Sequence, residues 1–189
     1  MTRPRAMRPE AVAAVIRSGG VVAYPTEAVF GLGCDPRNPG AVRRLLHIKA
    51  RPEHKGLILV AADFRQLTPF LAPVPDALRD RALATWPGPV TWLWPAAPET
   101  PGWLTGSHPS LAVRVTGHPM TAALCRHAGT PLVSTSANRA GHPPSREAGT
   151  VDHHLGRALD LILEGATGGR ERPSEIRDLA TGKVLRPGR

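Results

Sequence analysis

LILVAA, at residues 57–62, is an uninterrupted apolar run that begins directly after Gly56. A short run of this kind is typical of a β-strand that is covered on both faces. The segment before it, Ala41 to Ile48, has the apolar spacing of a helix. A helix followed by a fully covered strand favours a layered α/β fold.

The same alternation is predicted over the rest of the chain. An opening helix is expected from Pro9 to Gly19, because proline suits a first helical turn and glycine a helix end. Further helices are predicted at 76–85 and 119–127, and strands at 21–24, 90–94, 111–115 and 132–134, with weaker candidates at 160–163 and 176–179. Thr26 to Asp35 lacks such periodicity and is predicted to be a functional loop. We therefore expect an α/β fold around a mixed sheet.

The composition is that of an ordinary folded domain. Hydrophobic residues make up 41% of the 189 residues and charged residues 21%, which excludes a disordered or fibrous protein. The pattern shows neither an internal repeat nor a linker. Residues 1–189 are therefore predicted to form a single domain.

Neither a metal centre nor a membrane span is predicted. Cys34 and Cys125 stand in no CxxC pattern, and the eight histidines form no HExxH motif. No apolar run approaches the roughly 18 residues of a membrane-spanning helix. The basic start, Met1 to Pro9, leads into no continuous apolar stretch. We expect a cytoplasmic protein without a disulfide framework.

The charge favours polyanionic partners. Lysine and arginine outnumber aspartate and glutamate by 24 to 15, a formal net charge of +9. Such a surplus attracts nucleotide phosphates and RNA, although aromatic residues for base stacking are few. We expect tRNA or another RNA as a partner.

Four polar segments follow predicted strands or helices, where an open α/β sheet presents its ligand crevice. The first is PTEAVFGLG at 25–33, in which a proline turn precedes a hydroxyl, a carboxylate and two glycines. A plain turn with Glu27 as a solvated charge explains this segment equally well.

Because no P-loop or dinucleotide fingerprint is present, those two nucleotide-binding classes are disfavoured.

The second segment is KARP at 49–52. Lys49 and Arg51, fixed by the following proline, can hold a triphosphate and offset charge at its α-phosphorus. The structural alternative is that two cations at the end of a helix are favoured by the helix dipole alone.

The third segment, STSAN at 134–138, is the most informative. Alternate residues of a strand face one way, so Ser134, Ser136 and Asn138 are predicted to point into one cleft and bind phosphate or carboxylate oxygens. An N-cap or a hydroxyl-mediated turn is the alternative.

The fourth segment is PSEIRD at 173–178, together with LRPG at 185–188, either of which fits an exposed turn. Arg114 is more unusual because it lies between Val113 and Val115 in a predicted strand. A charge in that place needs a partner or a ligand unless the strand is at an edge.

Taken together, these segments resemble those of the YrdC/TsaC family of threonylcarbamoyl-AMP synthases. The matching segments are PTEAVFGLG at 25–33, KARP at 49–52, WPGPVT at 86–91, LAVRVT at 111–116, STSAN at 134–138 and PSEIRD at 173–178. They span nearly the whole chain and correspond to the short, single-domain bacterial form. The resemblance implies a twisted open mixed sheet flanked by helices, with a large basic concave cavity in which ATP and L-threonine lie side by side.

The resemblance also implies the site residues. By this likeness, the ATP site comprises Lys49, Arg51, Ser136, Asn138 and Arg186. The threonine site comprises Thr26, Arg114, Ser134 and Ser174. Lys49 and Arg51 are expected to act electrostatically, without a dedicated acid or base, and no protein-bound metal is implied.

The expected reaction joins L-threonine, bicarbonate and ATP into L-threonylcarbamoyladenylate and pyrophosphate, with Mg²⁺ accompanying ATP. The product serves the threonylcarbamoyladenosine modification of tRNA beside the anticodon, so downstream threonylcarbamoyl transferase proteins are expected partners. One alternative is a non-catalytic RNA-binding or ribosome-maturation module, which the net charge alone would support. Another is carbamoyl transfer in hydrogenase maturation, which uses a related domain in a larger chain with zinc-binding cysteines.

Overall fold

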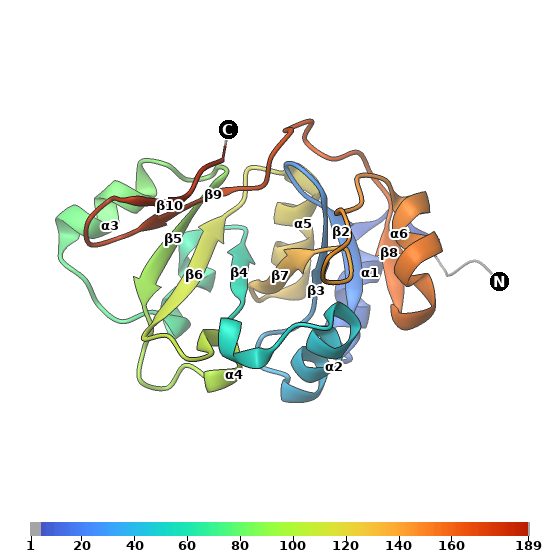
Figure 1. Cartoon of the computed structure of the whole chain (residues 1–189), viewed down its shortest axis with the longest axis horizontal. Helices are drawn as coiled ribbons and strands as arrows, with labels where there is room; N and C mark the ends of the chain where they lie inside the picture. The colour runs from blue at the N-terminus through green and yellow to red at the C-terminus, as the bar shows by residue number, and fades with distance from the viewer. Residues whose placement is uncertain (1–4, 189) are drawn as a thin grey trace.

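A computed structural model describes residues 5–188, which build a ten-stranded mixed sheet flanked by helices (Figure 1). The strand order is β1-β8-β2-β3-β7-β4-β6-β5-β9-β10. The strands are β1 (Arg5–Ala6), β2 (Val22–Pro25), β3 (Phe30–Gly33), β4 (Ile58–Ala61), β5 (Val90–Pro95), β6 (Ser110–Val115), β7 (Leu132–Ser136), β8 (Leu161–Leu163), β9 (Glu175–Asp178) and β10 (Val184–Arg186). The α-helices are α1 (Pro9–Arg17), α2 (Pro39–Lys49), α3 (Asp76–Leu83), α4 (Gly102–Thr105), α5 (Pro119–Ala128) and α6 (Ala148–Leu155). Short 3-10 helices occupy Glu53–Lys55, Phe64–Gln66, Thr68–Phe70 and Gly156–Ala158.

The predicted α/β fold with a mixed sheet is confirmed. The sheet contains both parallel neighbours, such as β4 and β6, and antiparallel neighbours, such as β5 and β6. The strands predicted around residues 57–62, 90–94, 111–115 and 132–134 are β4, β5, β6 and β7. None of the helices in the described residues is long and apolar enough to cross a membrane.

The prediction of a loop from Thr26 to Asp35 is partly wrong, because Phe30–Gly33 forms β3. This strand pairs antiparallel with both β2 and β7. Its two glycines conceal the usual apolar alternation, but they let the neighbouring strand approach. A Cβ atom at Gly33 would lie only 2.6 Å from the backbone oxygen of Val133. Close strand packing therefore requires the glycine that had suggested a loop.

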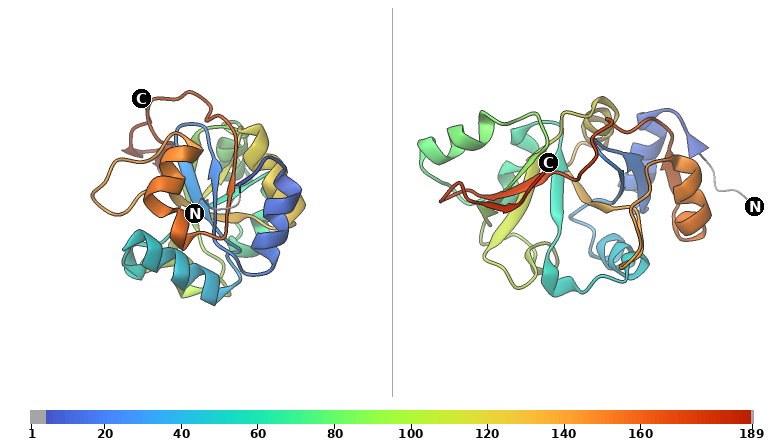
Figure 2. Two further views of the ribbon diagram at one scale, coloured as in Figure 1. Left: turned by 90° about the vertical axis from the view of Figure 1, so that its right-hand side faces the viewer. Right: turned by 45° about the horizontal axis from the view of Figure 1, so that its top comes forward.

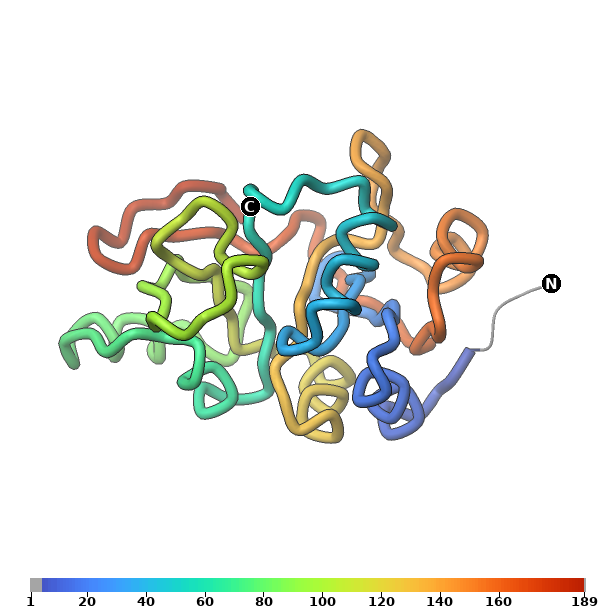
Figure 3. The backbone as a smooth tube through the Cα atoms, turned by 90° about the horizontal axis from the view of Figure 1, so that it is seen from below, coloured from blue at the N-terminus to red at the C-terminus, as the bar shows by residue number. Residues whose placement is uncertain are grey.

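Helices cover both faces of the sheet. Along β2 and the preceding Val21, successive side chains pack alternately against the helices on the two faces. Val22 and Tyr24 pack with α1 and α5, whereas Val21 and Ala23 pack into the larger cluster that includes residues of α2 and α6. This is the alternation expected of a strand covered on two faces. Figure 2 shows α1 and α5 on one side of the strands and α2 and α6 on the other. Seen from below, α1 and α5 lie side by side (Figure 3).

The strand register creates a row of small and apolar residues across the sheet. Ser134 of β7 is opposite Ile58 of β4, which is opposite Ala112 of β6, and Ala112 is opposite Leu93 of β5. Because side chains alternate along a strand, Ser136 and Arg114, two residues further along their strands, lie on the same face as this row. Polar groups from distant parts of the chain therefore meet on one face.

The start of α2 depends on a side-chain cap, which can be tested. The Asn38 side chain accepts a hydrogen bond from the Ala41 backbone N–H at 3.0 Å, and Pro39 occupies the first turn. Asn38→Ala removes this acceptor and is expected to lower the free energy of unfolding by about 1 kcal/mol, measured by urea unfolding. Arg43→Ala, at an exposed position in the same helix, is the control. Equal stabilities of the two variants would contradict the capping role.

Candidate active site

A cavity of about 380 Å³ lies over this row of the sheet. Its lining includes Ser134, Ile58, Ala112 and Leu93, the four residues that the register aligns. Eight of the nine residues predicted for the site also line it: Thr26, Lys49, Arg51, Arg114, Ser134, Ser136, Ser174 and Arg186. The fold therefore gathers segments that are up to 160 residues apart, from Thr26 to Arg186, around one space.

Lys49, the last residue of α2, is surrounded by oxygen atoms of the STSAN segment. Its Nζ donates to the backbone and side-chain oxygens of Ser136 at 2.7 and 2.9 Å, and to the backbone oxygen of Asn138 at 2.9 Å. It also contacts the side-chain oxygen of Asn138. An ammonium has only three N–H groups, so these four acceptors saturate it. Lys49 therefore holds the turn at Ser136 to Asn138 in shape.

The charge of Lys49 is sensitive to its surroundings. Burial, and then the positive charge of Arg51, lower the pKa of Lys49 to about 8. The surrounding oxygen atoms favour the charged ammonium, in opposition to burial. The side chain can thus add a positive potential to the cavity near neutral pH.

Asn138 lies differently from the expectation that it shares a cleft with the two serines. It is not among the residues lining the cavity, because the chain turns after Ser136. Its side-chain oxygen accepts a hydrogen bond from the Ser136 hydroxyl at 2.6 Å, and its Nδ2 donates to the backbone oxygen of Arg139 at 3.1 Å. The strand alternation that predicted one shared cleft ends where β7 ends. In this structure, Asn138 supports the turn from behind.

Arg51 is held by the loop that follows α2. Its Nε and Nη2 donate to the backbone oxygen of Gly56 at 3.2 and 2.9 Å. Ala50 stands between Lys49 and Arg51 in the left-handed conformation, with a φ of 50°, which ends the helix. Within the described residues nothing accepts a hydrogen bond from Nη1 of Arg51, and the side chain lines the cavity. This guanidinium can therefore donate to an anionic ligand.

The loop between β2 and β3 is fixed mainly by backbone hydrogen bonds. The backbone N–H and the hydroxyl of Thr26 both donate to the Val29 oxygen, at 3.1 and 2.6 Å. The backbone N–H groups of Gly168 and Arg170 donate to the carbonyl oxygens of Thr26 and Glu27, at 2.9 and 3.0 Å. The Thr26 hydroxyl thus keeps only its acceptor capacity for a ligand.

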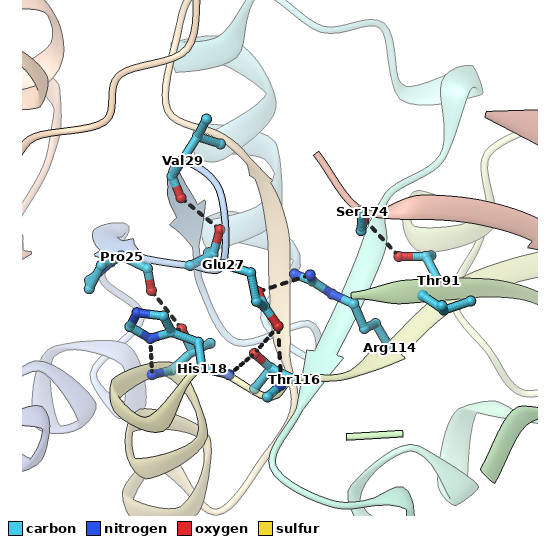
Figure 4. Close-up of polar contacts among 12 residues, drawn as sticks. Pro25, Glu27, Val29, Thr91, Arg114, Thr116, His118 and Ser174 are labelled. Atoms are coloured by element: carbon cyan, nitrogen blue, oxygen red, sulfur yellow. Dashed lines mark hydrogen bonds and ion pairs between the residues drawn. The ribbon is translucent and has the colours of Figure 1, made fainter. Parts of the chain in front are cut away.

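Glu27 is not the solvated charge that the sequence also allowed. Its side chain is 12% exposed and pairs with Arg114, which is 7% exposed, at a distance of 2.9 Å (Figure 4). The other carboxylate oxygen accepts hydrogen bonds from the Thr116 hydroxyl at 2.8 Å and the Gly117 backbone N–H at 3.1 Å. Burial raises the pKa of Glu27, but the charge of Arg114 and these hydrogen bonds outweigh it and hold the pKa below its usual value. Arg114 is thus paired with the carboxylate of Glu27, as a charged residue in a covered strand requires.

The opposite wall comes from the C-terminal strands. The hydroxyls of Ser174 and Thr91 are 3.0 Å apart (Figure 4), and Nη2 of Arg186 donates to the Ser174 backbone oxygen at 2.8 Å. Burial, and then the charge of Arg114, lower the pKa of Arg186. Two guanidiniums from β6 and β10 therefore act on each other across the cavity.

The electrostatic balance of the cavity is strongly positive. Its described lining contains five cations, Lys49, Arg51, Lys55, Arg114 and Arg186, and one carboxylate, Glu27. Sequence reasoning missed Lys55 and the role of Glu27. An available signal for Lys55 was its position four residues after Arg51, directly before Gly56. Such a cavity is built to hold anionic groups away from bulk water and to offset their charge.

Comparison with known proteins identifies the family. Residues 14–188 match the family model Sua5_yciO_yrdC, described as "Telomere recombination". The chain belongs to the Sua5/YciO/YrdC family. A relative from Nitrosococcus oceani, named threonylcarbamoyl-AMP synthase, is 56% identical over 92% of this chain and 94% of its own length. The family expected from the motifs is thus confirmed.

Solved structures of the family support the fold. The crystal structure of P. abyssi Sua5 complexed with L-threonine matches with a TM-score of 0.89 and 31% identity over 99% of this chain. The chain spans 57% of the length of that protein. The crystal structure of E. coli YciO matches with a TM-score of 0.83 and 26% identity, over 99% of this chain and 93% of its own.

The role of Lys49 in holding the turn predicts a stability effect. Lys49→Met removes the ammonium that four oxygens of Ser136 and Asn138 share, and is expected to lower the free energy of unfolding by about 1–3 kcal/mol. Arg51→Met is the matched control, because Arg51 is half-buried and its loss frees only the backbone oxygens of Lys55 and Gly56. Urea unfolding measures both. A larger loss in Arg51→Met than in Lys49→Met would contradict the role.

Proposed function

We propose that this protein forms L-threonylcarbamoyladenylate and pyrophosphate from L-threonine, bicarbonate and ATP. It is an enzyme of the nucleotidyltransferase type, as the names of its curated relatives indicate. The observation that carries the proposal is the cationic cavity in which the Ser136 turn and Arg114 lie on one face of the sheet. ATP and the carboxylate of threonine are the anions that these cations would hold.

The chemistry requires placement more than proton transfer. The threonine amine adds to bicarbonate and releases water, which gives a carbamate. A carbamate oxygen then attacks the α-phosphorus of ATP, the bond to the β-phosphate oxygen breaks, and pyrophosphate leaves. Holding anionic reactants side by side and offsetting their charge supplies most of the catalysis in such transfers.

We assign a role to each group of residues around the cavity. The free Nη1 of Arg51 would donate to phosphate oxygens. The hydroxyl of Ser136, which donates to Asn138 in the structure, would do so after its proton turns toward the nucleotide. Lys49 and Asn138 would act on the nucleotide mainly by shaping the Ser136 turn and, for Lys49, through its charge. Arg186 would lie near the nucleotide. The threonine side would be formed by Thr26, Arg114, Ser134 and Ser174, which line the cavity.

We propose that Mg²⁺ enters bound to ATP and is not held by the protein alone. The described residues contain no group of three histidine, cysteine, aspartate or glutamate side chains able to hold a metal ion. Glu27, the carboxylate in the described lining, is already engaged by Arg114 and Thr116. Phosphate oxygens are therefore the natural ligands for Mg²⁺ here.

The product would serve the modification of tRNA beside the anticodon. The formal net charge of +9 supports contact with tRNA, and a downstream threonylcarbamoyl transferase would consume the adenylate. The proposed setting is the cytoplasm, where tRNA and ATP are available, and residues 1–189 would act as one domain.

The activity test measures pyrophosphate release from ATP by the pure protein. Release is expected only when L-threonine, bicarbonate and Mg²⁺ are all present. Lys49→Ala and Ser136→Ala are each expected to lower kcat by about 100- to 1000-fold, the usual loss when a preorganised electrostatic group is removed. Glu99→Ala, at an exposed position away from the cavity, is the control. Absence of release with RNA still bound would instead favour an RNA-binding module.

The pKa of Lys49 predicts how ATP binding depends on pH. The ammonium is present below about pH 8 and is lost as the pH rises through that value. ATP affinity, measured by calorimetry without threonine, is therefore expected to fall above about pH 8. Lys49→Arg keeps its charge, so its alkaline fall should lie at least one pH unit higher. The same pH dependence in both proteins would show that another group is responsible.

A further inference from the structure

The guanidinium of Arg114 has hydrogen-bonding capacity that the protein leaves unused. Nη1 donates to Glu27 at 2.9 Å. Nε is fully buried and has no acceptor among the described residues, and nothing there accepts from Nη2. Arg114 nevertheless lines the cavity. An unmet donor on a buried cation is costly. Nε is closed off from solvent, so Nη2, which is not among the fully buried unpaired atoms, is the donor that an acceptor on a ligand can reach.

The free side of Arg114 suits a carboxylate. A guanidinium presents its N–H groups in a planar fork, which pairs with the two oxygens of a carboxylate. The amino acid is the substrate that carries a carboxylate in the proposed reaction. The orientation of the fork therefore decides whether L-threonine is held correctly.

Glu27 is built to set that orientation. Its Oε2 accepts a hydrogen bond from Nη1 of Arg114, while its Oε1 accepts hydrogen bonds from the Thr116 hydroxyl and the Gly117 backbone N–H (Figure 4). Its backbone oxygen accepts the N–H of Arg170, so the residue is anchored at both ends. Without Glu27, the positive charge of Arg186 would tend to push the guanidinium away.

Other roles for Glu27 fit the contacts less well. A general base needs a free lone pair directed at the substrate and a pKa near the working pH. Both carboxylate oxygens of Glu27 instead accept hydrogen bonds from the protein, and its pKa lies below the usual value. These contacts leave it with a structural task inside the site.

We propose that Glu27 is a positioning residue that fixes the guanidinium of Arg114 so that the free N–H groups of its Nη atoms face the carboxylate of L-threonine. This inference rests on the proposed function. It assigns Glu27 an effect on threonine binding and none on the nucleotide. The Thr116 hydroxyl and the Gly117 N–H belong to the same arrangement because they hold the far oxygen of Glu27.

Calorimetric binding of L-threonine and of ATP to Glu27→Gln tests the proposal. The dissociation constant for L-threonine is expected to rise about 10- to 100-fold, as for the loss of a charge-assisted hydrogen bond. The dissociation constant for ATP is expected to stay within about twofold. Glu99→Gln, an exposed site, is the matched control and should change neither. Unchanged threonine binding in Glu27→Gln, or an equal loss of both ligands, would overturn the proposal.

A double-mutant cycle identifies the route of the effect. If Glu27 acts through Arg114, Glu27→Gln should weaken threonine binding by less than about twofold in an Arg114→Gln background. A full additional loss in that background would overturn the inference. Thr116→Val, which removes one hydrogen bond to Glu27, gives a milder test should Glu27→Gln unfold, and should weaken threonine binding about two- to fivefold. No effect of Thr116→Val in that case would also overturn it.

The same experiment separates this inference from the proposed function. Wild-type protein that binds L-threonine but releases no pyrophosphate would refute the synthase activity and leave the role of Glu27 to be decided by the variants. Wild-type protein that does not bind L-threonine would overturn the positioning role itself.

Discussion

The register of the central strands is the constraint on which the site depends. With Ser134 opposite Ile58 and Ile58 opposite Ala112, one face of β7, β4 and β6 carries the cavity. A slip of one residue would turn every side chain of a strand to the other face. Ser136 and Arg114 would then point into the apolar layer. The helices that cover the sheet hold this register by burying the alternate residues.

Two sets of polar contacts are built on these strands. In each set, a buried charged side chain fixes the position of another part of the site. Lys49 is enclosed by oxygens and shapes the turn that presents Ser136. Glu27 is enclosed by donors and shapes the direction of Arg114. In each case a buried charge is satisfied by the protein, which limits its cost. The groups left free, on Arg51 and Arg114, are donors suited to anionic ligands.

Local signals predicted much of this molecule. Apolar periodicity located β4 to β7 and the main helices, because burial on one or both faces leaves a pattern in the sequence. It failed at β3, where close strand packing requires glycine in place of an apolar side chain. It also missed β1, β10, α4 and α6, which are short or exposed and leave little pattern. The polar residues of the site were found chiefly through their resemblance to a family.

By itself, the sequence determined the α/β class, the family and eight of the residues that line the cavity, since these follow from local pattern and from the order of the motifs. Only the tertiary structure decided how those residues divide their work. Glu27 and Arg114 are 87 positions apart, and no local pattern states that one holds the other. Asn138 likewise does not line the cavity, because β7 ends at Ser136 and the chain turns there. Pairing across the sheet is a matter of register and burial, which depend on the whole fold.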